Sequence, residues 1–110
     1  DIDSQAVGAA RQNFRRLRIQ KQVSLAQGSV PHPTAPAGSI DLAVANISAR
    51  GVADRAPFIL AALKPGAVFV ASGLLKTQQP EVDEAVAPLG FSLVREWPRE
   101  EWTTLVYQAP

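Results

Sequence analysis

The chain has 110 residues, of which 46% are hydrophobic, and a formal net charge of +1, which suits a single small domain with a modest core. It contains no cysteine, which excludes disulfides, thiolate metal sites and a cysteine nucleophile. No apolar run approaches the roughly 20 residues that span a bilayer and no signal-peptide pattern opens the chain, so we expect a cytoplasmic protein without a membrane partner.

Apolar residues recur at helical spacing near the start of the chain and predict an amphipathic helix over residues 4–18. Asp3 is the expected N-cap, because its carboxylate can accept hydrogen bonds from the free amides of the first turn. The segment is rich in basic side chains, namely Arg11, Arg15, Arg16, Arg18 and Lys21. No aromatic residues interleave usefully with these charges, so we expect a solvated helix face and no specific nucleic-acid binding.

The middle of the chain alternates between strand and helix patterns. A short strand is expected over residues 23–27, and a proline-rich loop over residues 28–39. Residues 40–45 are almost wholly apolar, as in a parallel strand that helices cover on both faces. A helical pattern follows over residues 48–63, in which Pro57 removes an amide donor and predicts a break or kink.

The last third begins with Lys64-Pro65-Gly66, which ends the preceding helix, and with a buried strand over residues 68–71. A short helix is expected over residues 77–87. Thr77 is its expected N-cap, and its core positions are Val82, Val86 and Leu89. Pro88 and Gly90 are expected to end it. Two final strands over residues 91–97 and 102–107 enclose a hairpin turn and are therefore antiparallel. The fold class is α/β, with a mostly parallel sheet that ends in an antiparallel hairpin.

Two features suggest chemistry and are better explained without it. His32 is the only histidine and lies between two prolines, so a solvated side chain is favoured over a catalytic one. Neither a Ser, His and acid set nor a metal-ligand cluster is recognisable, and we expect no metal site. Trp97 and Trp102 flank the hairpin turn, where cross-strand packing is favoured over a stacking platform.

Several motifs occur together in one order: DIDSQAV, then Asn13, DLAVANISA, LKPGA, SGLL and EEWTTLVYQ. In these motifs, over essentially all 110 residues, the chain resembles the bacterial methyltransferases of ribosomal protein L11. The resemblance implies a Rossmann-like class I methyltransferase core, S-adenosylmethionine as cofactor, and transfer of methyl groups to amino groups of a ribosomal protein. It also implies that residues 1–110 are a partial catalytic domain, without the first strand, the glycine-rich cofactor loop and the N-terminal substrate domain.

The resemblance also implies roles for particular residues. Asp1 matches the acidic residue that holds the cofactor ribose, since a carboxylate accepts two hydrogen bonds from a diol; the alternative is a solvated aspartate. Asp3 matches a second cofactor-binding acid, although helix capping explains it equally well. Asn46 matches the catalytic residue beside the transferable methyl and is also a cofactor-binding candidate; its carbonyl can accept a hydrogen bond from the substrate amine. A structural asparagine at a strand end is the alternative.

Some positions depart from the family pattern. Ser29 follows Gly28 where many class I methyltransferases keep an aspartate for the adenine amino group, so Gly28 and Ser29 are weaker cofactor candidates. Ile47 is not such a departure: many other amine methyltransferases place a proline there, but isoleucine belongs to the Ala-Asn-Ile element on which the resemblance depends. Ser4 replaces a frequent proline, and Ala67 replaces the second glycine of a Lys-Pro-Gly-Gly turn.

Two alternatives to this function remain. One is a class I amine methyltransferase that acts on another protein, a nucleic acid or a small molecule. The other is a folded core that catalyses nothing and self-associates. For the chain alone we expect little or no binding of S-adenosylmethionine, no activity, and self-association through the strand edge at residues 40–45, since the strand that would pair there is not among these residues.

Overall fold

Helix α1 (Ser4–Arg16) is the regular element of the first of two units, Asp1–Thr34, in the computed structural model, which describes all 110 residues. The helix begins after Asp3, whose carboxylate accepts a 2.8 Å hydrogen bond from the Gln5 amide, and this confirms the predicted N-cap. It ends two residues before the predicted boundary, because Arg18 has a φ of 58° that a right-handed helix does not allow.

The strand predicted over residues 23–27 does not form, so this prediction is wrong. The first unit contains no strand with which the segment could pair, and isolated extended backbone gains nothing over irregular structure. The last residue of this segment and the residue after it instead form hydrogen bonds with the start of the chain. The Gly28 amide donates to the Asp1 carbonyl at 2.8 Å, and the Gln27 side-chain amide donates to the Ile2 carbonyl at 3.3 Å.

The second unit, Ala35–Pro110, is built on a four-stranded sheet. In the order β1-β2-β4-β3, its strands are β1 (Ile40–Asn46), β2 (Leu63–Leu75), β4 (Trp102–Gln108) and β3 (Ser92–Arg99). β1 and β2 are parallel, whereas β2 with β4 and β3 with β4 are antiparallel, which confirms the α/β class and the final hairpin. The sheet is mixed, with fewer parallel pairings than predicted, because residues 23–27 contribute no strand.

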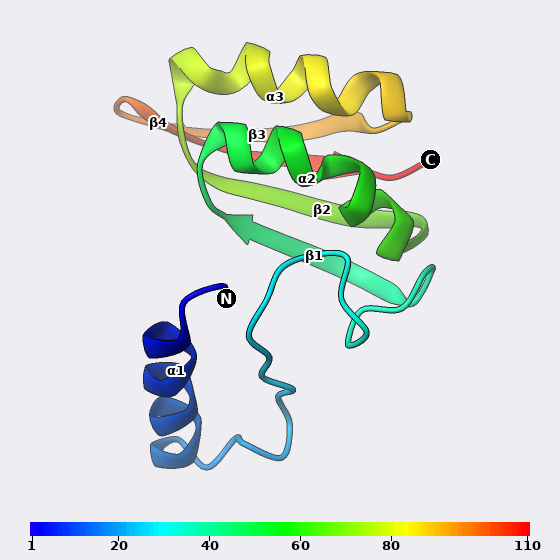
Figure 1. Cartoon of the computed structure of the whole chain (residues 1–110). Coiled ribbons are helices and arrows are strands. Elements are labelled where there is room, and N and C mark those ends of the chain that lie inside the picture. The colour runs from blue at the N-terminus through cyan, green and yellow to red at the C-terminus, as the bar shows by residue number, and fades with distance from the viewer. The chain divides into compact units, whose positions relative to one another are not determined.

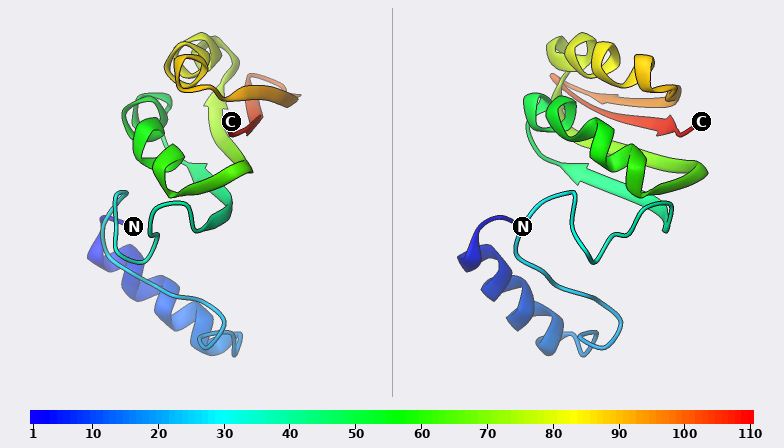
Figure 2. Two further views of the ribbon diagram at one scale, coloured as in Figure 1. Left: turned by 90° about the vertical axis from the view of Figure 1, so that its right-hand side faces the viewer. Right: turned by 45° about the vertical axis from the view of Figure 1, so that its right-hand side comes forward.

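Helices α2 (Ala49–Ala62) and α3 (Gln79–Val86) lie side by side on one face of this sheet (Figures 1 and 2). α2 continues through Pro57, so the predicted break does not occur. A proline inside a helix loses a hydrogen bond and crowds the preceding turn, and burial of the opposite face offsets that cost. Val52 and Ala56 have no exposed surface, while Pro57 lies on the exposed side.

Short 3-10 turns flank α3, namely η1 (Lys76–Gln78) and η2 (Ala87–Leu89). Thr77 lies inside η1 and does not cap α3, so that prediction is wrong. The N-cap residue of α3 is Gln78, whose side chain makes no cap bond to α3 and accepts at 2.9 Å from the Leu75 amide at the start of η1. Gly90 ends η2 with a φ of 93°, as predicted from its position. The predicted core residues Val82 and Val86 are fully buried, whereas Leu89 is only half-buried.

The core of the second unit lies between the two helices and the sheet. The rings of Phe69, Phe91 and Tyr107 form its centre, with centroids 5.9 to 6.4 Å apart. The other face of the sheet has no covering element within this unit, and Val44 of β1 is 65% exposed. The prediction that helices cover this strand on both faces is therefore not met within the second unit.

The two tryptophans lie at the hairpin without facing each other directly. Trp97 pairs with Thr104, and Trp102 pairs with Arg99. The Arg95 guanidinium lies 4.3 Å from the centre of the Trp97 ring, on the same strand. Trp97 thus packs against the Arg95 guanidinium of its own strand rather than against Trp102.

Candidate functional site

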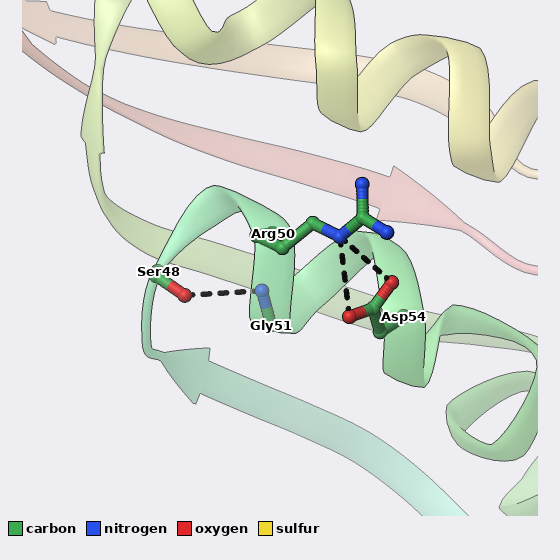
Figure 3. A network of polar contacts seen from close by, with 4 residues as sticks. All are labelled: Ser48, Arg50, Gly51 and Asp54. Carbon is green, nitrogen blue, oxygen red and sulfur yellow. Dashed lines mark hydrogen bonds and ion pairs between the residues drawn. The ribbon is translucent and has the colours of Figure 1, made fainter.

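The carboxyl end of β1 leads into α2 through only Ile47 and Ser48, which follow Asn46. The Ser48 hydroxyl accepts a 3.0 Å hydrogen bond from the Gly51 amide and caps the helix, as Figure 3 shows. A serine cap stabilises a helix start by about 1 kcal/mol and fixes the direction in which the chain enters it. Asn46 is therefore held at the rim of the sheet, where its side chain is exposed.

The turn from β1 into α2 leaves little room for a side chain at Gly51. A Cβ atom at Gly51 would lie 3.1 Å from both Ile47 Cδ1 and Ser48 Oγ, closer than is usual for such contacts. On the outer side of the same helical turn, Arg50 Nε lies 3.1 and 3.3 Å from the two oxygens of Asp54 (Figure 3). Both side chains are largely exposed, so this pair contributes no more than about 0.5 kcal/mol.

The end of β2 forms the other part of the rim. In the parallel register Asn46 lies opposite Ser72, and Gly73 follows with a φ of 73°. The β2–β4 register shifts between Ala71 and Leu74, so the backbone at Gly73 leaves the regular ladder. The carboxyl ends of parallel strands are where open α/β sheets bind ligands, and this rim holds Asn46, Ser72 and Gly73.

The other predicted site residues belong to the first unit. Asp1 Oδ1 accepts from the Asp3 amide at 2.9 Å, and the Asp1 carbonyl accepts from the Gly28 amide. The structure thus brings Asp1, Asp3 and Gly28 together, with Ser29 next in the chain. Asp3 Oδ1 is engaged as the helix cap, whereas Asp1 has a second carboxylate oxygen for another donor. Asn46 belongs to the second unit, where its neighbours are Ser72 and Gly73.

His32 has a structural role in the loop. Its Nδ1 accepts from the Thr34 amide at 3.2 Å and lies 2.9 Å from the Thr34 hydroxyl. Its ring also lies 3.1 Å from the position that a Cβ on Gly28 would take. His32 is half-buried and bonded within its own loop, whereas the sequence favoured a solvated side chain over a catalytic one.

A cavity of about 240 Å³ lies in the first unit, between α1 and the segment after it. Arg11, Phe14, Arg15, Gln20, Val23 and Leu25 line it. None of the predicted site residues contributes to this cavity. The five basic residues singled out in the sequence are all exposed, as a solvated face requires.

No group of three or more His, Cys, Asp and Glu side chains is arranged to hold a metal ion. None of the helices has the length and apolar character needed to cross a membrane.

Sequence reasoning missed Ser72 and Gly73 as members of the rim. The string SGLL was noticed only as a family motif, and no local pattern places it opposite Asn46. The available signal was a glycine within a strand, which often marks a bulge or a close approach.

Comparison with known proteins identifies relatives along the whole chain. The family described as ribosomal protein L11 methyltransferase (PrmA) matches residues 1–110. The ribosomal protein L11 methyltransferase of Chloroflexus aurantiacus is 30% identical across the whole chain, which covers 40% of that protein. The protein of the same name from Gloeobacter violaceus is 36% identical over 96% of the chain, which covers 33% of it. The chain thus spans about two fifths or less of the length of these curated relatives.

Solved structures agree with this match. The ribosomal protein L11 methylase of Lactobacillus delbrueckii subsp. bulgaricus superimposes with a TM-score of 0.83 at 25% identity, over 99% of this chain and 55% of that one. A SAM-dependent methyltransferase of Aquifex aeolicus gives a TM-score of 0.75 at 13% identity, over 98% of this chain and 65% of that one, and shows the shared fold alone. The Rossmann-like methyltransferase fold expected from the sequence is thereby confirmed.

Proposed function

Because the chain belongs to the ribosomal protein L11 methyltransferase family, we propose that the rim around Asn46 holds the substrate amine during methyl transfer from S-adenosylmethionine. One observation supports this most: Asn46 is exposed at the carboxyl end of β1 and is fixed there by the capped turn into α2. That end of an open α/β sheet is the usual location of ligands.

The residues of the first unit suit a nucleoside. The Asp1 carboxylate would accept hydrogen bonds from the ribose hydroxyls, since its Oδ1 bond to the Asp3 amide leaves a second oxygen. Gly28 and Ser29 would face the adenine side, where the exposed Ser29 hydroxyl offers one weaker hydrogen bond. Asp3 would act mainly as the helix cap that keeps Asp1 in place. When bound, S-adenosylmethionine supplies an electrophilic methyl group on a positively charged sulfur.

Asn46 would position the nucleophile. Its side-chain carbonyl accepts a hydrogen bond from an N–H of the substrate amine, which turns the nitrogen lone pair in one direction. The amine must be unprotonated, because a protonated amine has no lone pair to donate. Correct orientation of two reactants supplies a large share of the rate enhancement in such reactions, so Asn46 acts by placement rather than by a covalent step.

The wider function follows from the relatives. We propose that residues 1–110 form part of the catalytic domain of a longer enzyme, since the chain matches two fifths or less of its curated relatives. Its substrate is a large-subunit ribosomal protein, L11, and it therefore acts in the cytoplasm, where ribosomes are assembled. We further propose that the chain on its own self-associates through the free edge of β1, which pairs only with β2.

Substitutions in the full-length enzyme separate the two roles. Asn46→Ala should lower kcat by about a hundredfold while the Kd for S-adenosylmethionine stays nearly constant, because the interaction concerns the amine. Asp1→Ala should instead raise that Kd first. Gln12→Ala removes a side-chain amide from an exposed position of α1 and is the control that should change neither parameter. Equal effects of Asn46→Ala and Asp1→Ala on both parameters would contradict these roles.

A further inference from the structure

We propose that Gly73 is a positioning residue, which sets the orientation of the Asn46 side chain and through it that of the substrate amine. The inference rests on the proposed function of Asn46. Gly73 lies near the carboxyl end of β2, directly after Ser72, which is the register partner of Asn46. The two residues therefore meet across neighbouring strands at the same rim.

The space beside Gly73 is already occupied by the asparagine amide. A Cβ atom on Gly73 would lie well within 3.0 Å of Asn46 Oδ1, a separation that real Cβ atoms essentially never show. The same atom would lie 3.4 Å from Asn46 Cγ, which is ordinary van der Waals contact. The Asn46 amide oxygen thus lies against the bare α-carbon of Gly73, in the volume that any other side chain at this position would take.

The backbone at Gly73 also requires glycine. Its φ of 73° lies in the left-handed region, which glycine enters without the steric cost that other residues incur. This conformation coincides with the register shift between Ala71 and Leu74, where β2 departs from its ladder with β4. The local departure presents the α-carbon of Gly73, rather than a side chain, to Asn46.

Gly66 supplies a matched control within the same strand. Its φ is 74°, so an alanine there experiences the same backbone strain, but no atom lies within 4 Å of its Cβ position. Gly66 lies near the other end of β2, away from the rim. A difference in kcat or in stability between Gly73→Ala and Gly66→Ala therefore arises from the contact with Asn46 and not from the left-handed backbone.

The expected response to Gly73→Ala is a rotation of Asn46. The crowded atom is the end of a flexible side chain, so the asparagine can turn away while the sheet stays folded. A small displacement of a positioning group is enough to slow transfer strongly, since reacting atoms must be aligned closely. Gly73 would thus influence the reaction without touching the substrate.

Steady-state kinetics of the full-length enzyme test the inference. Gly73→Ala should lower kcat by about tenfold or more, with the Kd for S-adenosylmethionine changed by less than about twofold. Gly66→Ala should leave kcat unchanged. Equal kcat losses in the two alanine variants would overturn the inference, because strain alone would then explain them.

Stability measurements on the 110-residue chain test the contact without relying on activity. Gly73→Ala should lower the denaturant midpoint more than Gly66→Ala does. When each substitution is made separately in the Asn46→Ala variant, the two should lower the midpoint equally. A larger decrease with Gly73→Ala that persists without the asparagine side chain would contradict the contact. In the wild-type chain, nuclear Overhauser effects should join the Gly73 α-protons to the Asn46 side chain, and their absence would overturn the proposal even if the variants fail to fold.

The two measurements separate this inference from the proposed function. If Asn46→Ala itself leaves kcat unchanged while the stability coupling is present, the proposed role of Asn46 fails and the contact stands. If Asn46→Ala slows the reaction but Gly73→Ala does not, the role of Asn46 stands and positioning by Gly73 is wrong.

Discussion

Tyr107 illustrates how a single side chain connects the sheet to a helix. It is 1% exposed, its ring packs against Phe69 and Phe91, and its hydroxyl donates a 2.7 Å hydrogen bond to Asp83 of α3. Burial raises the pKa of the Tyr107 phenol far above its ordinary value, and the hydrogen bond to Asp83 and the nearby negative charges of Asp83 and Glu96 add to this. The folded state therefore resists loss of the phenolic proton.

The raised pKa of Tyr107 predicts that the folded chain loses stability at alkaline pH. The pKa is higher in the folded than in the unfolded chain, so the stabilisation is complete below pH 10.0, the ordinary tyrosine value, and declines as the pH rises above it. The expected slope approaches about 1.4 kcal/mol per pH unit for this one proton. Denaturant unfolding at a series of pH values measures it.

Tyr107→Phe is the control for that slope. The variant should be less stable than the wild type at neutral pH, by about 1 to 3 kcal/mol, because Asp83 loses its partner. Between about pH 10 and 12 its stability should decline less than that of the wild type. An equally steep decline in both proteins would show that another group is responsible.

For single residues, the sequence predicts local features better than contacts between residues that are distant in the chain. Asp3 as an N-cap needs only the residues that follow it, and Asn46 is placed by the strand that ends there. Gly73 opposite Asn46 depends on the register between two strands separated by a helix, which no pattern within either segment contains. The candidate site was therefore predicted as single residues and not as a rim.

At the scale of elements, predictions succeed where the local pattern and the tertiary contacts agree. α1, α2 and the final hairpin are present in the expected segments. Residues 23–27 have a strand-like sequence but only the first two residues of the chain, which form no strand, to bond with. Pro57 is tolerated because the buried face of α2 holds the helix on the sheet. In both cases the deciding factor is a contact outside the segment.

The free edge of β1 leads to a prediction about association. Only one side of this strand is paired, and its side chains Leu42 and Val44 are 56% and 65% exposed. Because an unpaired edge strand with apolar side chains recruits further strands, we expect the isolated chain to self-associate at micromolar concentration. Sedimentation velocity measures this directly, and a purely monomeric chain would contradict it.

Matched substitutions locate the association. Val44→Lys introduces a charge on β1 and should shift the chain toward monomer. Val94→Lys introduces the same charge on β3, the strand at the other edge of the sheet, where Val94 is 54% exposed, and should leave association unchanged. If Val94→Lys dissociates the chain and Val44→Lys does not, association uses the other edge.

At the scale of the whole molecule, the sequence leads to a prediction about cofactor binding. The chain contains no Gly-x-Gly turn, which is the element that lets a backbone approach a nucleotide cofactor closely. We therefore expect the 110-residue chain to bind S-adenosylmethionine weakly or not at all, while the full-length enzyme binds it. Calorimetric titration compares the two, and saturable binding by the chain in the low micromolar range would contradict this expectation.

We propose that these residues form part of an enzyme that methylates ribosomal protein L11 with Asn46 at the transfer site. The most direct test of this proposal is incubation of purified L11 with methyl-labelled S-adenosylmethionine and either the full-length enzyme, its Asn46→Ala variant, or the 110-residue chain. We predict rapid labelling of L11 by the wild-type enzyme, labelling slower by about a hundredfold with the variant, and none with the chain alone. Unlabelled L11 with the wild-type enzyme would contradict the proposed activity, and equal labelling by the Asn46→Ala variant would contradict the proposed role of Asn46.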